Sequence, residues 1–135
     1  MRQPPSILLI GDDTARMARM REILSRTARV TQAEDLPQAL KRLALDDYEA
    51  VFADWRFYFG TWKDALQQIS ELYPGLPVIV ISDPGGMERG SLQWREAIAA
   101  GAFDLLPSDC GEFELLSLAE QAVASARARA LLATA

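Results

Sequence analysis

The stretch EAVFADWRFYFG (residues 49–60) decides how this chain is interpreted, because an apolar run stops there at a carboxylate and gives way to aromatic residues. The run from Ala50 to Ala53 leads straight into the carboxylate of Asp54. Five aromatic residues then occur between positions 55 and 62. A short run of this kind, bounded by a charged residue, is typical of a strand that is buried on both faces.

Similar apolar runs occur elsewhere and extend this interpretation to the whole chain. The clearest are SILLIG (6–11) and LPVIVIS (76–82), and weaker ones are ARVTQA (28–33) and AFDLLP (102–107). The clear runs do not alternate polar and apolar residues, which favours strands of a parallel sheet.

Stretches with helical spacing of apolar residues separate these runs. They cover residues 13–27, 35–46, 61–75, 91–101 and 111–135. Regular alternation of strand and helix predicts an α/β fold, with a parallel sheet, helices on both faces and right-handed crossovers. We expect one domain over residues 1–125, with residues 126–135 as a helix end or linker.

Composition narrows the classes of function. The chain has 135 residues and a net charge of −5, which allows one core and disfavours nucleic acid as a direct partner. No apolar run is long enough to span a bilayer, and no signal peptide is expected. The single cysteine, Cys110, fits a reducing cytosol. The absence of histidine excludes serine–histidine hydrolysis, histidine-ligated metals and histidine phosphotransfer.

Acidic and hydroxyl residues lie just beyond the ends of the expected strands. Asp12 and Asp13 come after the first run, Asp54 after the third, and Ser82 and Ser108 close to the ends of the last two. Because parallel strands end at one edge of the sheet, these side chains should gather there. Clustered carboxylates favour a hard cation such as Mg²⁺. The alternative is that the aspartates are helix caps or turn residues.

Four segments together resemble the receiver domain of two-component response regulators, over nearly the whole length of the chain. These segments are ILLIGDD (7–13), YEAVFAD (48–54), LPVIVIS (76–82) and AIAAGAFDLLP (97–107). The resemblance implies a flavodoxin-like fold with five strands in the order 2-1-3-4-5. It also implies a signalling module that is not an enzyme beyond its own phosphorylation and dephosphorylation.

The resemblance also implies roles for individual residues. Asp54 would be the phosphoryl acceptor, and Ser82 would be the hydroxyl that moves with the phosphoryl group during switching. Mg²⁺ would be bound by Asp12, Asp54 and the backbone carbonyl of Arg56, with Asp13 as a further candidate ligand. A cation is needed there because a carboxylate that attacks a phosphoryl group gathers negative charge.

Several positions depart from the receiver pattern. Gly11 stands where the first acid of the pair is usual, Ser108 replaces a lysine that pairs with the phosphoryl oxygens, and Leu105 replaces the switch aromatic. Replacing the charge-assisted contact of that lysine by a hydroxyl would cost about 1.5–3 kcal/mol. The segment DPGGMERGSLQW (83–94) is longer than usual, and Phe57-Tyr58 replaces a Met-Pro turn. These departures predict a weakened or absent phosphorylation switch.

The aromatic residues after Asp54 allow two interpretations. In the first, Phe57 and Phe59 pack beneath the next helix, and Trp62 lies on the core face of that helix. In the second, Trp55 and Tyr58, with Phe59, form an exposed rim that contacts a partner. Arg56 is a candidate for the positive charge that the missing lysine would supply.

The expected first helix carries Arg16, Arg19, Arg21 and Arg26. These arginines form either a solvated face or a surface that steers an acidic partner. In receivers the first helix commonly contacts the histidine kinase or phosphotransfer protein. The fourth helix, fifth strand and fifth helix often contact an output domain or a second copy.

Two functional hypotheses therefore remain. The chain is an atypical cytoplasmic receiver that accepts a phosphoryl group on Asp54 with Mg²⁺, or a pseudo-receiver that binds proteins without phosphorylation. A flavodoxin-like cofactor binder is disfavoured, because the first loop, GDDTAR (11–16), is acidic where a phosphate would need donors.

Overall fold

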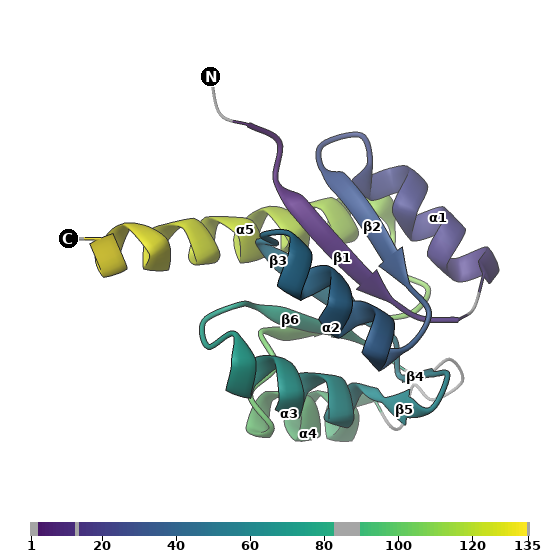
Figure 1. Ribbon diagram of the computed structural model, residues 1–135. Coiled ribbons are helices and arrows are strands. Elements are labelled where there is room, and N and C mark those ends of the chain that lie inside the picture. Colours follow the sequence, from purple (N-terminus) through teal and green to yellow (C-terminus); the bar gives the residue numbers. More distant parts are fainter. Residues whose placement is uncertain (1–2, 13, 83–89, 135) are drawn as a thin grey trace.

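The five apolar runs form one parallel sheet in the order β2-β1-β3-β6-β7 (Figure 1). Its strands are β1 (Ser6–Ile10), β2 (Arg29–Ala33), β3 (Ala50–Ala53), β6 (Val78–Ile81) and β7 (Asp104–Leu106). This computed structural model describes residues 3–12, 14–82 and 90–134. Since β6 and β7 are the fourth and fifth strands of the sheet along the chain, the predicted order 2-1-3-4-5 is confirmed.

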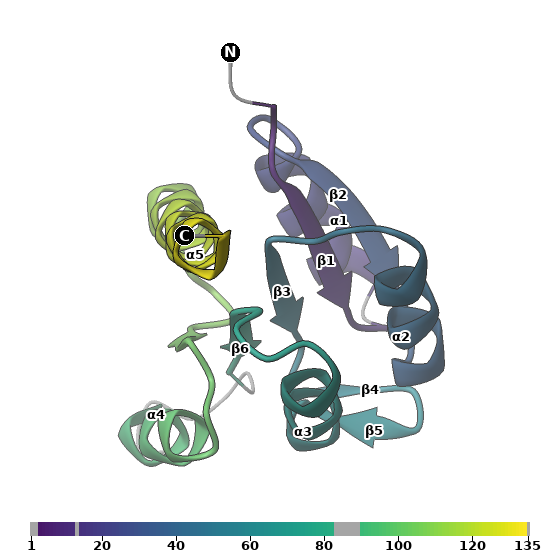
Figure 2. The same cartoon turned by 60° about the vertical axis from the view of Figure 1, so that its left-hand side comes forward.

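Helices cover both faces of the sheet, as predicted (Figure 2). They are α1 (Thr14–Leu24), α2 (Leu36–Leu45), α3 (Trp62–Leu72), α4 (Gly90–Ala99) and α5 (Glu112–Thr134). Helices α1 and α5 pack on one face, and α2, α3 and α4 pack on the other. No helix in the described ranges is both long and apolar enough to cross a membrane.

Strand β1 shows how the sheet divides the core into two layers. Ile7 and Leu9 point toward α1 and α5, while Leu8 and Ile10 point toward α2 and α3. All four side chains are fully buried, and each such burial contributes about 1.5–3 kcal/mol. A continuous apolar run was needed here because both faces of the strand are covered.

The register of β1 against β3 positions the carboxyl edge of the sheet. Ile10 pairs with Ala53, so the residues directly after each strand, Gly11 and Asp54, lie next to each other. The backbone N–H of Asp54 donates to the carbonyl of Ile10 at 2.8 Å. The position of Asp54 is therefore fixed by the sheet itself.

A two-stranded hairpin that the sequence did not predict lies between β3 and α3. It pairs β4 (Arg56–Phe57) with β5 (Gly60–Thr61) in antiparallel register, and Tyr58 and Phe59 form its tip. Strands of two residues are too short to show an alternating pattern. The backbone of Phe59 has φ of 59°, in the left-handed region that residues other than glycine rarely adopt.

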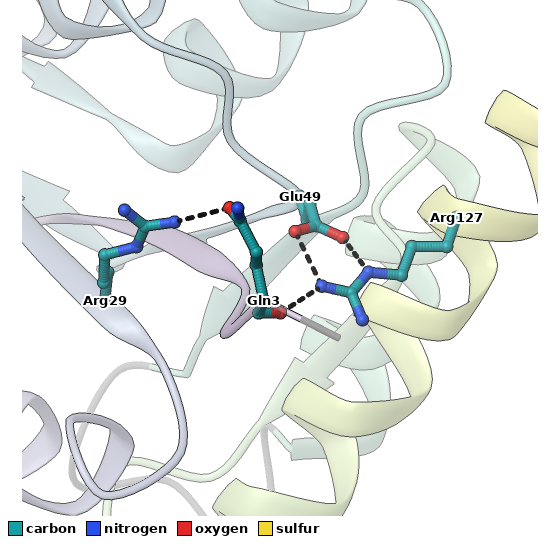
Figure 3. Close-up of polar contacts among 4 residues, drawn as sticks. All are labelled: Gln3, Arg29, Glu49 and Arg127. Carbon is teal, nitrogen blue, oxygen red and sulfur yellow. Dashed lines mark hydrogen bonds and ion pairs between the residues drawn. The ribbon is translucent and has the colours of Figure 1, made fainter. Parts of the chain in front are cut away.

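Helix α5 is tied to the amino-terminal edge of the sheet by an ion pair (Figure 3). The guanidinium of Arg127 donates to both carboxylate oxygens of Glu49, and it also donates to the Gln3 carbonyl at 3.0 Å. The side chain of Gln3 in turn accepts from Arg29 at 3.4 Å. Because α5 runs without interruption to Thr134, a boundary near residue 125 stays a prediction.

We expect Phe59→Asn to raise the free energy of unfolding by about 0.5–1 kcal/mol, because Asn adopts the left-handed conformation at lower cost than Phe. Chemical denaturation of the native chain and the variant measures the change. Tyr58→Asn is the matched control, since Tyr58 lacks a positive φ and should gain nothing. A loss of stability in Phe59→Asn would contradict the expected relief of strain.

Candidate functional site

Among the described residues, the carboxyl edge of the sheet carries one buried carboxylate, that of Asp54. Asp54 comes directly after β3, the central strand, and only 4% of the residue is exposed. Its Oδ1 accepts the backbone N–H of Trp55 at 2.8 Å. A carboxylate at this depth must be compensated by a donor or a cation, because removing a charge from water is costly.

Arg16 provides that cation. Its Nη1 lies 2.6 Å from Oδ1 of Asp54, and the two side chains are 16% and 5% exposed. Arg16 reaches the carboxylate because α1 begins just after β1, which places the first turn of the helix beside the end of β3. This is a charge-assisted hydrogen bond in a partly buried position, where such contacts are strongest.

Gly11 leaves little space on the other side of Asp54. A Cβ atom added to Gly11 would lie 2.9 Å from Sδ of Met17 and 3.2 Å from Cβ of Asp54. Met17 is itself fully buried, so a side chain at position 11 would force it to move. The glycine that departs from the receiver pattern is thus part of the packing around Asp54.

Binding of Mg²⁺ by Asp12, Asp54 and the Arg56 carbonyl stays a prediction. Asp12 is exposed, Arg56 lies in β4, and Asp13 lies outside the described residues. Within the described ranges, no three His, Cys, Asp or Glu residues group closely enough to hold a metal ion. Mg²⁺ requires oxygen ligands in near-octahedral geometry, whereas Oδ1 of Asp54 already accepts from a guanidinium.

The two serine positions lie at the same edge, and they contact each other. Ser82 comes directly after β6, and its Oγ accepts the backbone N–H of Ser108 at 3.3 Å. The backbone N–H of Ser82 donates to the carbonyl of Leu106 at 2.9 Å. Leu105 is half-buried and packs against the core that α2 and α3 cover. This part of the edge contributes hydroxyl and backbone groups to the site.

The aromatic residues after Asp54 divide between core and surface. Phe57 and Trp62 are buried as predicted, and Trp55 packs on Trp62 with ring centroids 5.3 Å apart. The interpretation that Phe59 packs beneath the helix is wrong, because this residue is 92% exposed. The positive φ of Phe59 turns its side chain out of the hairpin. Tyr58 is also exposed.

Three of the four arginines of α1 and the loop after it make specific contacts, whereas Arg21 is exposed. Besides the contact of Arg16, Arg19 donates to the carbonyl of Cys110 at 2.7 Å, and Arg26 forms an ion pair with Glu112 at 2.8 Å. The hydrogen bond and charge of Arg26 lower the pKa of Glu112. These contacts join the α1 side of the fold to the start of α5.

Comparisons with solved structures identify the fold. The chain superposes on NtrX from Brucella abortus with a TM-score of 0.84 and 24% identity, over 98% of this chain and 29% of that one. It matches the receiver domain of NtrX with a TM-score of 0.78 and 27% identity, over 87% and 97% of the two chains. The signal receiver domain of an HD domain-containing protein from Pseudomonas fluorescens gives 0.82 and 23%, over 96% and 93%.

The fold is therefore that of response-regulator receiver domains, and the resemblance predicted from the sequence is confirmed at this level. The chain spans less than a third of the length of full NtrX, but nearly all of the isolated receiver domains. No protein-family model and no curated protein matches the sequence.

The contact between Arg16 and Asp54 is the feature of the site that sequence reasoning missed. A signal was present: an arginine in the first turn of the helix after the first strand lies close to the carboxyl edge of the sheet. The sequence pointed instead to Arg56, which comes soon after Asp54 along the chain. Proximity in sequence was misleading because the chain turns away into the hairpin after Trp55.

We expect Arg16→Met to lower the free energy of unfolding by about 3–5 kcal/mol, because it removes the guanidinium that pairs with a buried carboxylate. The double variant Arg16→Met with Asp54→Asn should recover part of this loss. A double-mutant cycle from chemical denaturation measures the coupling. If the two substitutions changed the free energy of unfolding additively, this result would contradict a contact between Arg16 and Asp54.

The thiol of Cys110 should be unreactive near neutral pH, because burial raises its pKa and outweighs the opposing charge of Arg19. The proton is held more tightly in the folded state. The protonated thiol therefore contributes to the free energy of unfolding. This contribution is complete at pH values below the pKa of the unfolded thiol, and it is lost as pH rises through the pKa of the folded thiol. Alkylation rates at increasing pH, with and without denaturant, measure the effect. Equal rates in the two states would contradict it.

Proposed function

We propose that this chain is a receiver-type signalling module that acts by binding proteins, and that Asp54 is held by Arg16 instead of accepting a phosphoryl group with Mg²⁺. The observation that carries the proposal is the 2.6 Å contact between the Arg16 guanidinium and the buried Asp54 carboxylate. The receiver fold supports the signalling role. Receiver domains are in general signalling modules and not enzymes.

The contact opposes phosphorylation in two ways. A carboxylate that accepts a charged hydrogen bond is a weaker nucleophile, and an Oδ1 that already accepts from Arg16 is less available to a metal ion. Ser108 also provides no cation for a phosphoryl oxygen, which removes a charge-assisted contact of about 1.5–3 kcal/mol. A phosphorylated state would therefore be both slow to form and weakly held.

Phosphoryl acceptance on Asp54 with Mg²⁺ is the second candidate. It is favoured by the place of Asp54 at the end of the central strand, with Ser82 at the end of the neighbouring strand β6. This function requires Arg16 to leave the carboxylate. Asp12, Asp13 and the Arg56 carbonyl would then be the further ligands, with Ser82 as the switch hydroxyl.

The proposed partners are proteins of a cytoplasmic two-component pathway. A histidine kinase or phosphotransfer protein would contact α1, where Arg21 keeps an exposed side chain. An output domain or a second copy would contact α4, β7 and α5. The chain's negative charge argues against a direct nucleic-acid partner, and we propose no membrane partner.

Acetyl phosphate with Mg²⁺ should leave the intact mass of the native chain unchanged, because the Asp54 carboxylate is already paired. Mg²⁺ alone should leave the fluorescence of Trp55 and Trp62 unchanged. Mass spectrometry and a fluorescence titration measure the two effects in the native chain, Asp54→Asn and Arg16→Gln.

A phosphoryl adduct on the native chain that disappears in Asp54→Asn would overturn the proposal in favour of the second candidate. An adduct in Arg16→Gln alone would support the proposal, since it would show that Arg16 is what protects the carboxylate.

A further inference from the structure

The tip of the β4–β5 hairpin carries an exposed pair of aromatic rings. Phe59 is 92% exposed, more than any other large hydrophobic residue in the described ranges, and Tyr58 is 56% exposed. Their ring centroids lie 5.9 Å apart. The hairpin lies beside α2 and α3 (Figures 1 and 2).

The hairpin is held firmly beneath this tip. Phe57 is buried, and a Cβ added to Gly60 would lie 2.9 Å from its ring, so the turn fits closely over it. The backbone N–H of Thr61 donates to Asp64 at 3.0 Å, which fixes the start of α3. The backbone of Tyr58 also pairs with that of Asp35 in an isolated parallel β-bridge. The rings are thus presented by an ordered support.

The conformation of Phe59 is costly, and the contact of its ring with Tyr58 leaves the residue 92% exposed. A left-handed backbone costs about 1–2 kcal/mol for a residue with a Cβ, and glycine or asparagine would adopt it more easily. The ring buries almost no surface in return. Backbone strain that persists at an exposed side chain points toward a function for that side chain.

Arg56 is the cationic residue of the hairpin itself. Lys63 forms an ion pair with Glu96, whereas Asp35 and Asp64 accept hydrogen bonds from neutral backbone N–H groups and keep their negative charge. Arg56 is exposed on the hairpin face opposite the buried Phe57, with no ion pair among the described residues. The surface therefore offers two rings and one arginine, which are residue types enriched at binding hot spots.

We propose that the aromatic hairpin, defined as Arg56, Tyr58 and Phe59, inserts into an apolar pocket bordered by carboxylates on a partner protein. The pocket is inferred from the protruding rings, and its acidic border from the exposed guanidinium of Arg56, which forms no ion pair within the part of the chain that the structure describes. The inference rests on the proposed function, because it names the surface through which the module binds. Phosphoryl labelling of Asp54 would overturn that function without altering the binding properties of the hairpin.

Two cyclodextrins serve as defined probes of this chemistry. Sulfobutylether-β-cyclodextrin has an apolar cavity with an anionic border, and hydroxypropyl-β-cyclodextrin has a neutral border. Amide NMR titrations of the native chain locate and measure the binding of each. We expect both to bind at the hairpin, with the anionic host tighter.

Two variants distinguish the contribution of the Phe59 ring to binding from that of the Arg56 charge. Phe59→Asn, which we expect to be at least as stable as the native chain, should bind the anionic host about tenfold more weakly. Arg56→Gln should remove the preference for the anionic host. Phe113→Asn is the matched control, because Phe113 is 83% exposed on α5, and it should leave hairpin binding unchanged. Equal affinity of native chain and Phe59→Asn would overturn the proposal.

Photo-crosslinking in the cells that make the protein then tests the partner. With p-benzoylphenylalanine at position 59, the cross-link should map to an apolar pocket bordered by Asp or Glu on a second protein, and the anionic host should compete with it. The same group at position 113 should not give this cross-link. Cross-links to a second copy of this chain, to lipid, or to a pocket without acidic residues would each overturn the proposal.

Discussion

The site depends on one physical constraint: a carboxylate is buried at the end of the central strand, and it needs a cation. Pairing of β1 with β3 fixes Asp54 at this place, and the short connection from β1 to α1 brings Arg16 to it. The other departures from the receiver pattern are consistent with this arrangement. Gly11 adds no second acid beside the ion pair, and Ser108 adds no second cation. Because Arg16 and Asp54 carry opposite charges and pair with each other, the pair does not require a further acid at position 11 or a further cation at position 108.

Much of the fold could be predicted because helices cover both faces of the sheet. Continuous apolar runs such as Val78–Ile81 are buried on each side and show no alternation, which indicates parallel strands. The order of the strands was implied by the resemblance to receiver domains. The contact of Arg16 could not be predicted in the same way. A long flexible side chain has many reachable partners, and only the three-dimensional edge of the sheet selects Asp54. The hairpin was also missed, because its strands are too short for a pattern and its Phe59 adopts a conformation that aromatic residues rarely take.

The ion pair and the hairpin together suggest how such a module would work. If the charge of Asp54 is permanently balanced, the surface of the domain does not depend on the supply of phosphoryl groups. Recognition then rests on features that are always present, and the strained, exposed Phe59 is the clearest of these. Trp55 joins the two features, since it comes directly after Asp54 and packs on Trp62 at the start of α3. A partner that binds the hairpin would therefore lie close to the ion pair between Arg16 and Asp54.

The most direct test of this account is NMR detection of the hydrogen bond between the Arg16 guanidinium and the Asp54 carboxylate. A scalar correlation across the bond, from an Arg16 side-chain nitrogen to Cγ of Asp54, reports the contact itself. The account predicts that the correlation is present in the native chain and that saturating Mg²⁺ changes neither it nor the Cγ chemical shift. A saturable shift of Asp54 Cγ with Mg²⁺, accompanied by loss of the correlation, would show a working metal site and contradict the account.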